Sequence, residues 1–232
     1  MPEHTLKQFD AELEGLRARV LQMGGLVEEQ IVRAMEALAG GNTQIAVRVV
    51  DDDHKVNSLE IAIDEECSRI LARRQPTASD LRLVVAVIKT ITDLERIGDE
   101  ADRIARMAQD LAAQERIKAS YVEIGHLSKH VQQMLRSALD AFARMDAEAA
   151  LAVAREDQAV DREYEALLRQ CMTYMMEDPR TIRHVMDLIW SVRALERIGD
   201  HARNIAEYVI YFVKGKDVRH VSLEQMEKEV KQ

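Results

Sequence analysis

Leu94-Glu95-Arg96-Ile97-Gly98-Asp99 occurs a second time in this chain, as Leu195-Glu196-Arg197-Ile198-Gly199-Asp200. Six identical residues in the same order are very improbable by chance, so the pair predicts an internal repeat. Each copy places a Glu and an Asp four positions apart, which puts both carboxylates on one face of a helix. The rest of the chain can be examined relative to these two acidic pairs.

The composition is typical of a soluble helical protein. Of the 232 residues, 47% are hydrophobic and 31% charged, with only three Pro and nine Gly. Few helix breakers among many good helix formers favour long helices. A formal net charge of −9 argues against nucleic acid as a partner, because phosphate neutralisation needs clustered Lys and Arg.

The sequence also gives expectations about the cell compartment. No stretch of about 18 apolar residues is present, so we expect no membrane insertion. The start, Met1-Pro2-Glu3-His4, lacks the apolar region of a signal peptide, and we expect a cytoplasmic protein. The two cysteines, Cys67 and Cys171, occupy matching mid-helix positions and are expected in the core rather than in redox chemistry. We expect core packing also for Met172, Met175, Met176 and Trp190.

Apolar residues recur in steps of three and four from the start of the chain, which predicts a first helix with a long apolar seam. Gly40-Gly41 ends this helix, and Asn42 or Thr43 begins a second one that continues to about Arg74. After the turn at Pro76, a third helix covers about residues 80–115 and carries the first acidic motif.

The same plan then restarts from about Ile124. Asp146 is the predicted cap of the next helix, and Thr181 that of the last, which ends near Gly215. Early positions match at an offset of 104 residues and the acidic motifs at 101. The predicted fold is therefore all-α, with two tandem repeated three-helix bundles at residues 1–115 and 116–216 and a polar tail at residues 217–232. Whether the halves share one core stays open.

The acidic motifs lie beside the apolar seams of their helices. Glu95, Asp99 and Asp102 form one stripe, and Glu196 and Asp200 form the other. A glycine inside each stripe costs about 1 kcal/mol relative to Ala, which suggests close approach of another helix or a ligand.

Antiparallel hairpins bring further acids level with these stripes. In the first half Asp53 and Asn57 face the motif, and in the second half Asp157 and Asp161 do so. Carboxylates brought together in this way repel each other unless cations or protons intervene, and oxygen-rich clusters suit hard divalent cations or iron. The sequence thus predicts a metal site in each half.

Two alternatives stay open on residue patterns alone. Salt bridges with neighbouring arginines such as Arg96, Arg197 and Arg203 would make the acidic stripes ordinary solvated faces. A metal-dependent enzyme or metal store in a carboxylate-lined bundle is the other alternative, because di-iron bundles use Glu together with Glu-x-x-His motifs. Only residues 123–126, Glu-Ile-Gly-His, have that spacing, and we expect them to be an exposed helix end.

The sequence resembles the PhoU family over nearly the whole chain. The resemblance is carried by five stretches around the repeated motif, at residues 53–57, 73–82, 93–99, 172–179 and 196–207. It implies two three-helix bundles packed side by side, and metal ions, iron in some relatives, held by paired Glu/Asp-x-x-x-Asp motifs. By position, the implied metal ligands are Glu95, Asp99, Asp102, Asp53 and Asn57, and Glu196, Asp200, Asp157 and Asp161. Asn57 replaces a carboxylate, which predicts weaker binding in the first half.

The resemblance also implies a non-enzymatic regulator. Members repress the phosphate-starvation regulon when phosphate is plentiful. They are thought to act as cytoplasmic adaptors between the ATPase subunit of the phosphate ABC transporter and a membrane sensor histidine kinase. For this chain we accordingly expect these two partners, a homodimer, and no catalytic residues.

Overall fold

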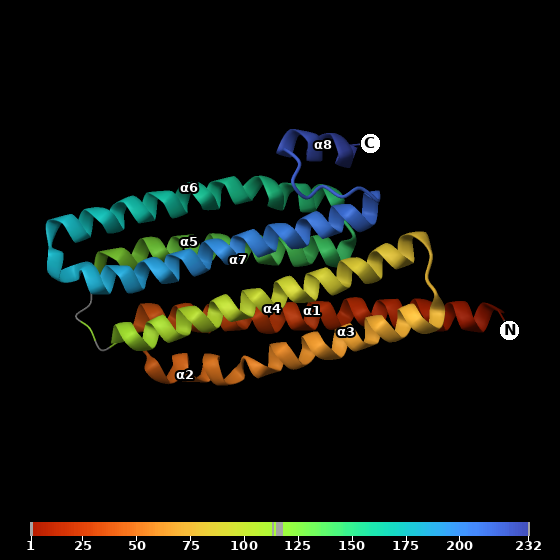
Figure 1. The fold of residues 1–232 in the computed structure, drawn as a ribbon, viewed down its shortest axis with the longest axis horizontal. Coiled ribbons are helices and arrows are strands. Elements are labelled where there is room, and N and C mark those ends of the chain that lie inside the picture. Colours follow the sequence, from red (N-terminus) through yellow and green to blue (C-terminus); the bar gives the residue numbers. More distant parts are fainter. Residues whose placement is uncertain (1, 113, 115–117, 232) are drawn as a thin grey trace.

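A computed structural model describes residues 2–112, 114 and 118–231, and these residues are almost entirely helical (Figure 1). The predicted boundary between residues 115 and 116 lies outside the described residues. The elements are α1 (Pro2–Gly40), α2 (Thr43–Asp52), α3 (His54–Arg74), α4 (Ala78–Ala112), α5 (Lys118–Arg144), α6 (Ala147–Glu177), the 3₁₀ turn η1 (Pro179–Thr181), α7 (Ile182–Lys214) and α8 (Leu223–Lys231).

Helix ends follow the expected chemistry in most places. Asn42 Oδ1 accepts from the N–H groups of Gln44 and Ile45 at the start of α2, and Asp146 Oδ1 accepts from Ala149 N–H at the start of α6. Gly215, at φ +71°, ends α7 in the left-handed conformation that glycine tolerates best. Thr181 is the N-cap residue of α7, as predicted, but its side chain does not cap the helix, because its hydroxyl donates to the Asp178 carbonyl at 2.7 Å instead.

The second helix of the first half is interrupted, which the sequence did not predict. α2 ends at Asp52, and α3 begins at His54. The backbone carbonyl of Asp53, between them, accepts a hydrogen bond from Val56 N–H, three residues further on, at 3.0 Å. Its counterpart Asp157 lies inside the continuous helix α6. A local change of helix pitch therefore occurs at one of the predicted ligands and not at its twin.

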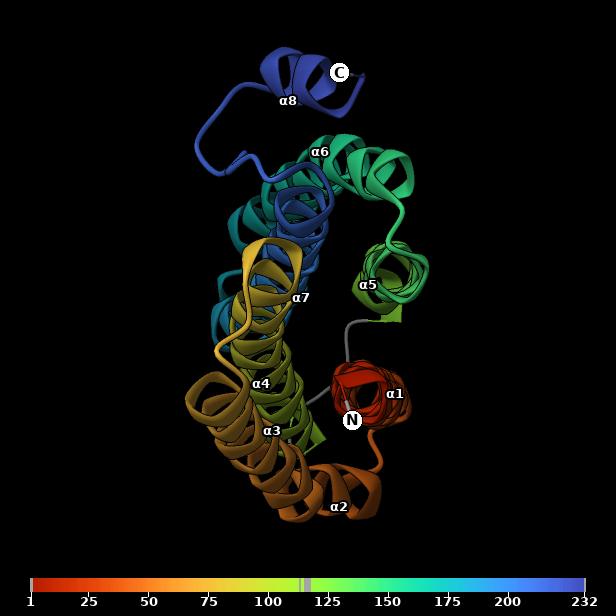
Figure 2. The same cartoon turned by 90° about the vertical axis from the view of Figure 1, so that its right-hand side faces the viewer.

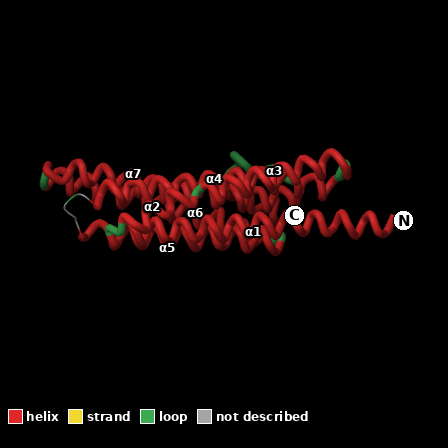
Figure 3. Tube along the Cα trace, turned by 90° about the horizontal axis from the view of Figure 1, so that it is seen from below, coloured by secondary structure: helices red, strands yellow, loops and turns green. Residues whose placement is uncertain are grey.

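The helices form two layers. Seen end-on, α1 and α5 lie in one layer and α4 and α7 in the other, with α3 and α6 at the two flanks (Figure 2). The view from below shows the same separation of α1 and α5 from α4 and α7 (Figure 3). The α4–α7 contact is the most extensive in the molecule, so the two motif-bearing helices form the joint between the halves.

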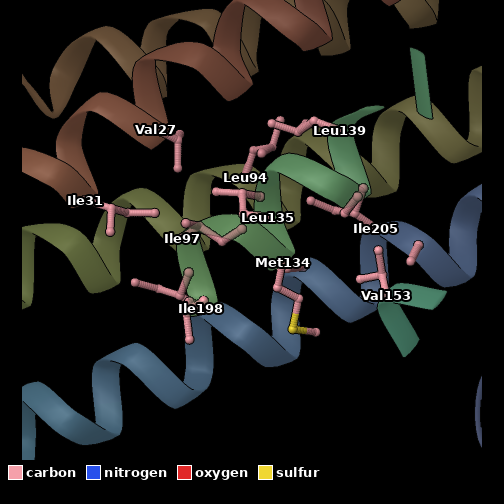
Figure 4. Close-up of a cluster of buried hydrophobic side chains, with 14 of the residues drawn as sticks. Val27, Ile31, Leu94, Ile97, Met134, Leu135, Leu139, Val153, Ile198 and Ile205 are labelled. Carbon is pink, nitrogen blue, oxygen red and sulfur yellow. The ribbon is translucent and has the colours of Figure 1, made fainter. Parts of the chain in front are cut away.

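The two halves share one core. Val27, Ile31 and Leu94 from the first half lie in the same apolar cluster as Leu135 and Ile198 from the second (Figure 4). Both cysteines are buried as expected. Burial of this continuous apolar surface is what holds the two repeats together as one body.

Some expected core residues lie at the surface instead. Met172, Met176 and Trp190 are 52%, 76% and 50% exposed. Conversely, the polar tail is partly ordered, because α8 buries Met226 and Val230 in the core cluster beside α6. Within the described residues, none of the helices has an apolar stretch of the length needed to cross a lipid bilayer.

Candidate functional site

The first acidic cluster lies where α3 runs beside α4, and we define it as Asp53, Asn57, Glu60, Glu95 and Asp99. Burial raises the pKa of Glu95, and the charges of Asp99, Glu60 and Asp53 raise it further. Burial and the charge of Asp53 likewise raise the pKa of Asp99. These acids are therefore close enough to repel one another, as hairpin geometry predicted.

Gly98 lets α1 and α3 approach α4 at this cluster. A Cβ at this position would stand 3.2 Å from Gln30 Oε1 and 3.5 Å from Asp53 Oδ1. Asp53 accepts from Gln30 Nε2 at 3.4 Å and from Asn57 Nδ2 at 3.1 Å. The first cluster thus includes an amide from α1, Gln30, which the sequence analysis missed because it sits beside the apolar seam residue Ile31.

Two amide oxygens of this cluster are buried without a hydrogen-bond partner among the described residues. They are Gln30 Oε1 and Asn57 Oδ1. Leaving such an acceptor unpaired in the interior costs about 1–3 kcal/mol unless another group satisfies it. Together with the repelling carboxylates, these oxygens form a donor set that fits a hard cation.

Asp102, also predicted as a metal ligand, pairs with a residue of its own helix, α4. Both of its carboxylate oxygens accept from Arg106, at 2.6 and 3.2 Å. Its charge still contributes to the raised pKa of Asp99. Asp102 is therefore at the edge of the first cluster, and paired.

The second acidic cluster consists of Asp157 and Asp161 on α6 with Glu196 and Asp200 on α7. Burial first, and then the charge of Asp200, raises the pKa of Glu196 to about 7. Burial and the charges of Asp157 and Asp161 raise the pKa of Asp200. All four predicted residues are thus brought together.

Arginines neutralise part of the second cluster. Arg203 Nη1 donates to Asp157 Oδ2 at 2.8 Å, and its Nε donates to Glu207 at 3.1 Å. Arg193 Nη1 donates to Glu196 Oε1 at 2.9 Å, while Glu196 Oε2 is buried without a partner among the described residues. The salt-bridge alternative therefore accounts for part of this cluster.

Metal coordination by the two acidic clusters stays a prediction. As the side chains stand, no three Asp, Glu, His or Cys groups in the described part of the chain are placed to share a metal ion. The structure brings the predicted residues into two clusters with suitable oxygen donors. Rotation of exposed side chains such as Asp99 and Asp200 would be needed to close a ligand shell.

A buried polar network between the two clusters was missed entirely. Asp93 of α4, 2% exposed, accepts from His201 Nδ1 at 2.6 Å, Asn204 Nδ2 at 3.1 Å and Tyr208 Oη at 2.7 Å, all on α7. Nearby, buried Glu100 accepts from Arg197 Nε across the same joint at 2.7 Å. In the sequence, Asp93, His201 and Asn204 lie in the stretches that carry the family resemblance, but nothing there indicated that they pair.

Comparison with known proteins gives a consistent result. The model of the PhoU domain matches this chain twice, at residues 20–108 and 124–209. The chain is 54% identical to a Pseudomonas aeruginosa phosphate-specific transport system accessory protein PhoU homolog, over 99% of this chain and 95% of that protein. It is 50% identical to the accessory protein PhoU of Escherichia coli K12, over 97% and 93% of the two chains.

Solved structures agree. The crystal structure of PhoU from P. aeruginosa, 55% identical, superposes with a TM-score of 0.87 over 90% of this chain and 100% of that one. The phosphate transport system regulatory protein PhoU from Streptococcus pneumoniae, 32% identical, gives a TM-score of 0.83 over 90% and 99%. Both matches extend over the two halves.

Proposed function

The chain belongs to the PhoU family, and we propose that it is a regulatory accessory protein of a phosphate-specific transport system. The observation that carries this proposal is identity of 50% or more to such proteins over nearly the whole chain. The family is regulatory and not enzymatic. The metal-enzyme alternative therefore falls away, and metal binding would serve structure or regulation.

More specifically, we propose a negative regulator of the phosphate-starvation regulon that acts in the cytoplasm, as a homodimer. It would link the ATPase subunit of the phosphate ABC transporter to a sensor histidine kinase. An adaptor needs more than one free surface, and long helices offer several. The exposed apolar side chains around the α6–α7 turn, Met172, Met176, Ile182, Met186 and Trp190, are of the kind that protein-binding surfaces present.

We further propose that the two acidic clusters hold divalent or iron ions. In the first half Glu95, Asp99, Asp53, Asn57 and Glu60 would supply the oxygen donors. In the second half Glu196, Asp200, Asp157 and Asp161 would do so. A bound cation would offset carboxylate repulsion and so hold α3 against α4 and α6 against α7.

The regulatory role is tested with a phosphate-controlled alkaline phosphatase reporter in cells that lack this chain and grow in abundant phosphate. We expect high reporter output that the intact gene restores to low. Output that stays low in the deletion strain would contradict a repressor role. The link to the sensor histidine kinase is tested by deleting the kinase gene in the same strain. Reporter output should fall if the chain acts through that kinase, and it should stay high if it does not.

A further inference from the structure

A pocket between α5 and α6 has polar walls of a different kind from the acidic clusters. It encloses about 430 Å³, and its polar lining is Glu123, His126 and His130 from α5 with Glu163 and Gln170 from α6. The two helices run antiparallel in the second half of the molecule and pack against each other (Figure 1). The pocket includes the Glu-x-x-His stretch that sequence analysis singled out and that the proposed function leaves unused.

His130 is held between two carboxylates of α6. Its Nδ1 lies 2.9 Å from Glu163 Oε1, and its Nε2 lies 2.5 Å from Glu156 Oε1. The side chain is 20% exposed, so the ring is fixed in the mouth of the pocket. In a metal-binding histidine one ring nitrogen binds the ion and the other is oriented by a carboxylate. One of the two carboxylates can serve that purpose here, once the other nitrogen is released to an ion.

Two further groups are poised at the same place. His126 is exposed and lies one turn before His130, so both rings project from one face of α5. Glu123 Oε2 is buried with no hydrogen-bond partner among the described residues. Glu123 lines the same pocket as the two histidines, so its unsatisfied oxygen adds a carboxylate donor to their imidazoles.

We propose that Glu123, His126, His130 and Glu163 bind a divalent transition-metal ion of the zinc type. Mixed imidazole and carboxylate donors suit Zn²⁺, whereas the all-oxygen clusters suit harder ions. Binding requires His126 to rotate inward and His130 to exchange one carboxylate for the ion, because no three of these groups share a site as the side chains stand.

Among the described residues, the matched positions of the first half carry none of these four side chains. The positions matched at the 104-residue offset to Glu123, His126, His130 and Glu163 are Arg19, Gln22, Leu26 and Leu59. There Arg19 forms a salt bridge with Glu66 and so occupies the corresponding space with its own cation. The site therefore belongs to the second half alone, and it does not depend on the proposed regulatory function.

The test is a Zn²⁺ titration in a background that removes both acidic clusters, E95Q/D99N/E196Q/D200N. We expect this background to bind one Zn²⁺ per chain, and H126N added to it to weaken binding at least about tenfold, as loss of a ligand should. Co²⁺ should give a visible absorption band that H126N removes. His126 is exposed, so H126N should leave the thermal unfolding curve measured by circular dichroism unchanged. H130N removes a second proposed ligand, but the His130 ring is mostly buried, so this variant can also lose stability.

Two results would overturn the site. One is an equal Zn²⁺ affinity with and without His126. The other is an absence of Zn²⁺ binding in the folded background variant, which would assign any zinc bound by the native chain to the acidic clusters. A matched control, K129N, changes an exposed residue of the same helix outside the pocket and should leave Zn²⁺ affinity unchanged.

Discussion

The two acidic clusters carry the same Glu-x-x-x-Asp motif, but they balance its charge with different groups. In the first cluster Asp53 accepts hydrogen bonds from the amides of Gln30 and Asn57. In the second, the matched residue Asp157 accepts from the guanidinium of Arg203. The matched pairs that differ are Gln30 and Met134, Asn57 and Asp161, Glu60 and Tyr164, Thr92 and Arg193, and Asp102 and Arg203.

The glycines show what both copies retain. A Cβ at Gly98 would stand 3.2 Å from Gln30 Oε1, and a Cβ at Gly199 would stand 3.3 Å from Val160 Cγ1, both tighter than most such contacts. In both halves the glycine serves close helix approach, whether the neighbours are polar or apolar. The backbone packing of the motif is therefore common to the two halves, while its charge balance has diverged. In the second cluster Arg203 and Arg193 pair with the acids, whereas in the first cluster the amides of Gln30 and Asn57 bond to Asp53.

The largest expected effect comes from the joint between the clusters. Asp93 is matched by Ala194, so Asp93→Ala makes the first half copy the second. The change leaves His201, Asn204 and Tyr208 without their shared acceptor in the interior. We expect a loss of about 3–5 kcal/mol in unfolding free energy, measured by urea denaturation. Tyr208→Phe removes one of the three bonds and should cost only about 1 kcal/mol. Equal stability of Asp93→Ala and the native chain would show that the network does not hold the joint.

The next prediction concerns two variants that each give one cluster the charged residue of the other. Arg203→Asp gives the second half the residue of the first, and it leaves Asp157, whose side chain is 3% exposed, without its cation. We expect a loss of about 2 kcal/mol in chelator, discounted because Arg203 itself is 36% exposed. The mirror change, Asp102→Arg, gives up only a pair with the exposed Arg106 and should stay within about 0.5 kcal/mol of the native chain. If both changes cost the same, the clusters are not balanced differently.

The sequence predicts the repeat and the helices well because both depend on local pattern. Apolar spacing gives the seams, and helix periodicity with hairpin register brings Glu95 level with Asp53 and Glu196 level with Asp161. Contacts that cross between helices through long side chains leave no such pattern. The sequence indicated Arg203 as a salt-bridge partner of the acidic stripes, but not its bond to Asp157, which depends on its rotamer and on how α6 packs on α7. The three donors to Asp93 were not predicted, because they depend on how α4 packs on α7.

The exposure of some apolar side chains could not be predicted from the sequence either. Apolar residues such as Met176 and Trp190 mark a face of a helix, and in this fold no other element of the described chain covers them. Periodicity identifies an apolar face but not the element that packs on it. The interruption at Asp53 was equally hidden, because residues 51–55, Asp-Asp-Asp-His-Lys, contain no Pro or Gly.

We expect the two acidic clusters to differ in their affinity for a divalent cation. From Asn57 alone the first half was expected to bind more weakly, but the arginines of the second half now favour the opposite order. One unit charge at roughly 10 Å from a divalent ion contributes about 3.3 kcal/mol at an effective dielectric constant of 20, which is on the order of a hundredfold in affinity. We therefore expect E95Q/D99N to remove the tighter Mn²⁺ site and E196Q/D200N to remove the weaker one in equilibrium dialysis. The reverse assignment would mean that the amide matters more than the arginines.

The last expected effect is a pH dependence that is stronger in the second cluster than in the first. Burial and the charge of Asp200 raise the pKa of Glu196 to about 7, from an ordinary value of 4.5. Between these values the folded chain binds more protons than the unfolded chain, so stability falls as pH rises through this window and levels off above it. With chelator present, Glu196→Gln should flatten that slope. Glu95→Gln should flatten it less, because the pKa of Glu95 is raised without a comparably large shift. Equal slopes in both variants would mean that the arginines of the second cluster offset its extra burial, so that charge balance and desolvation cancel in the two halves.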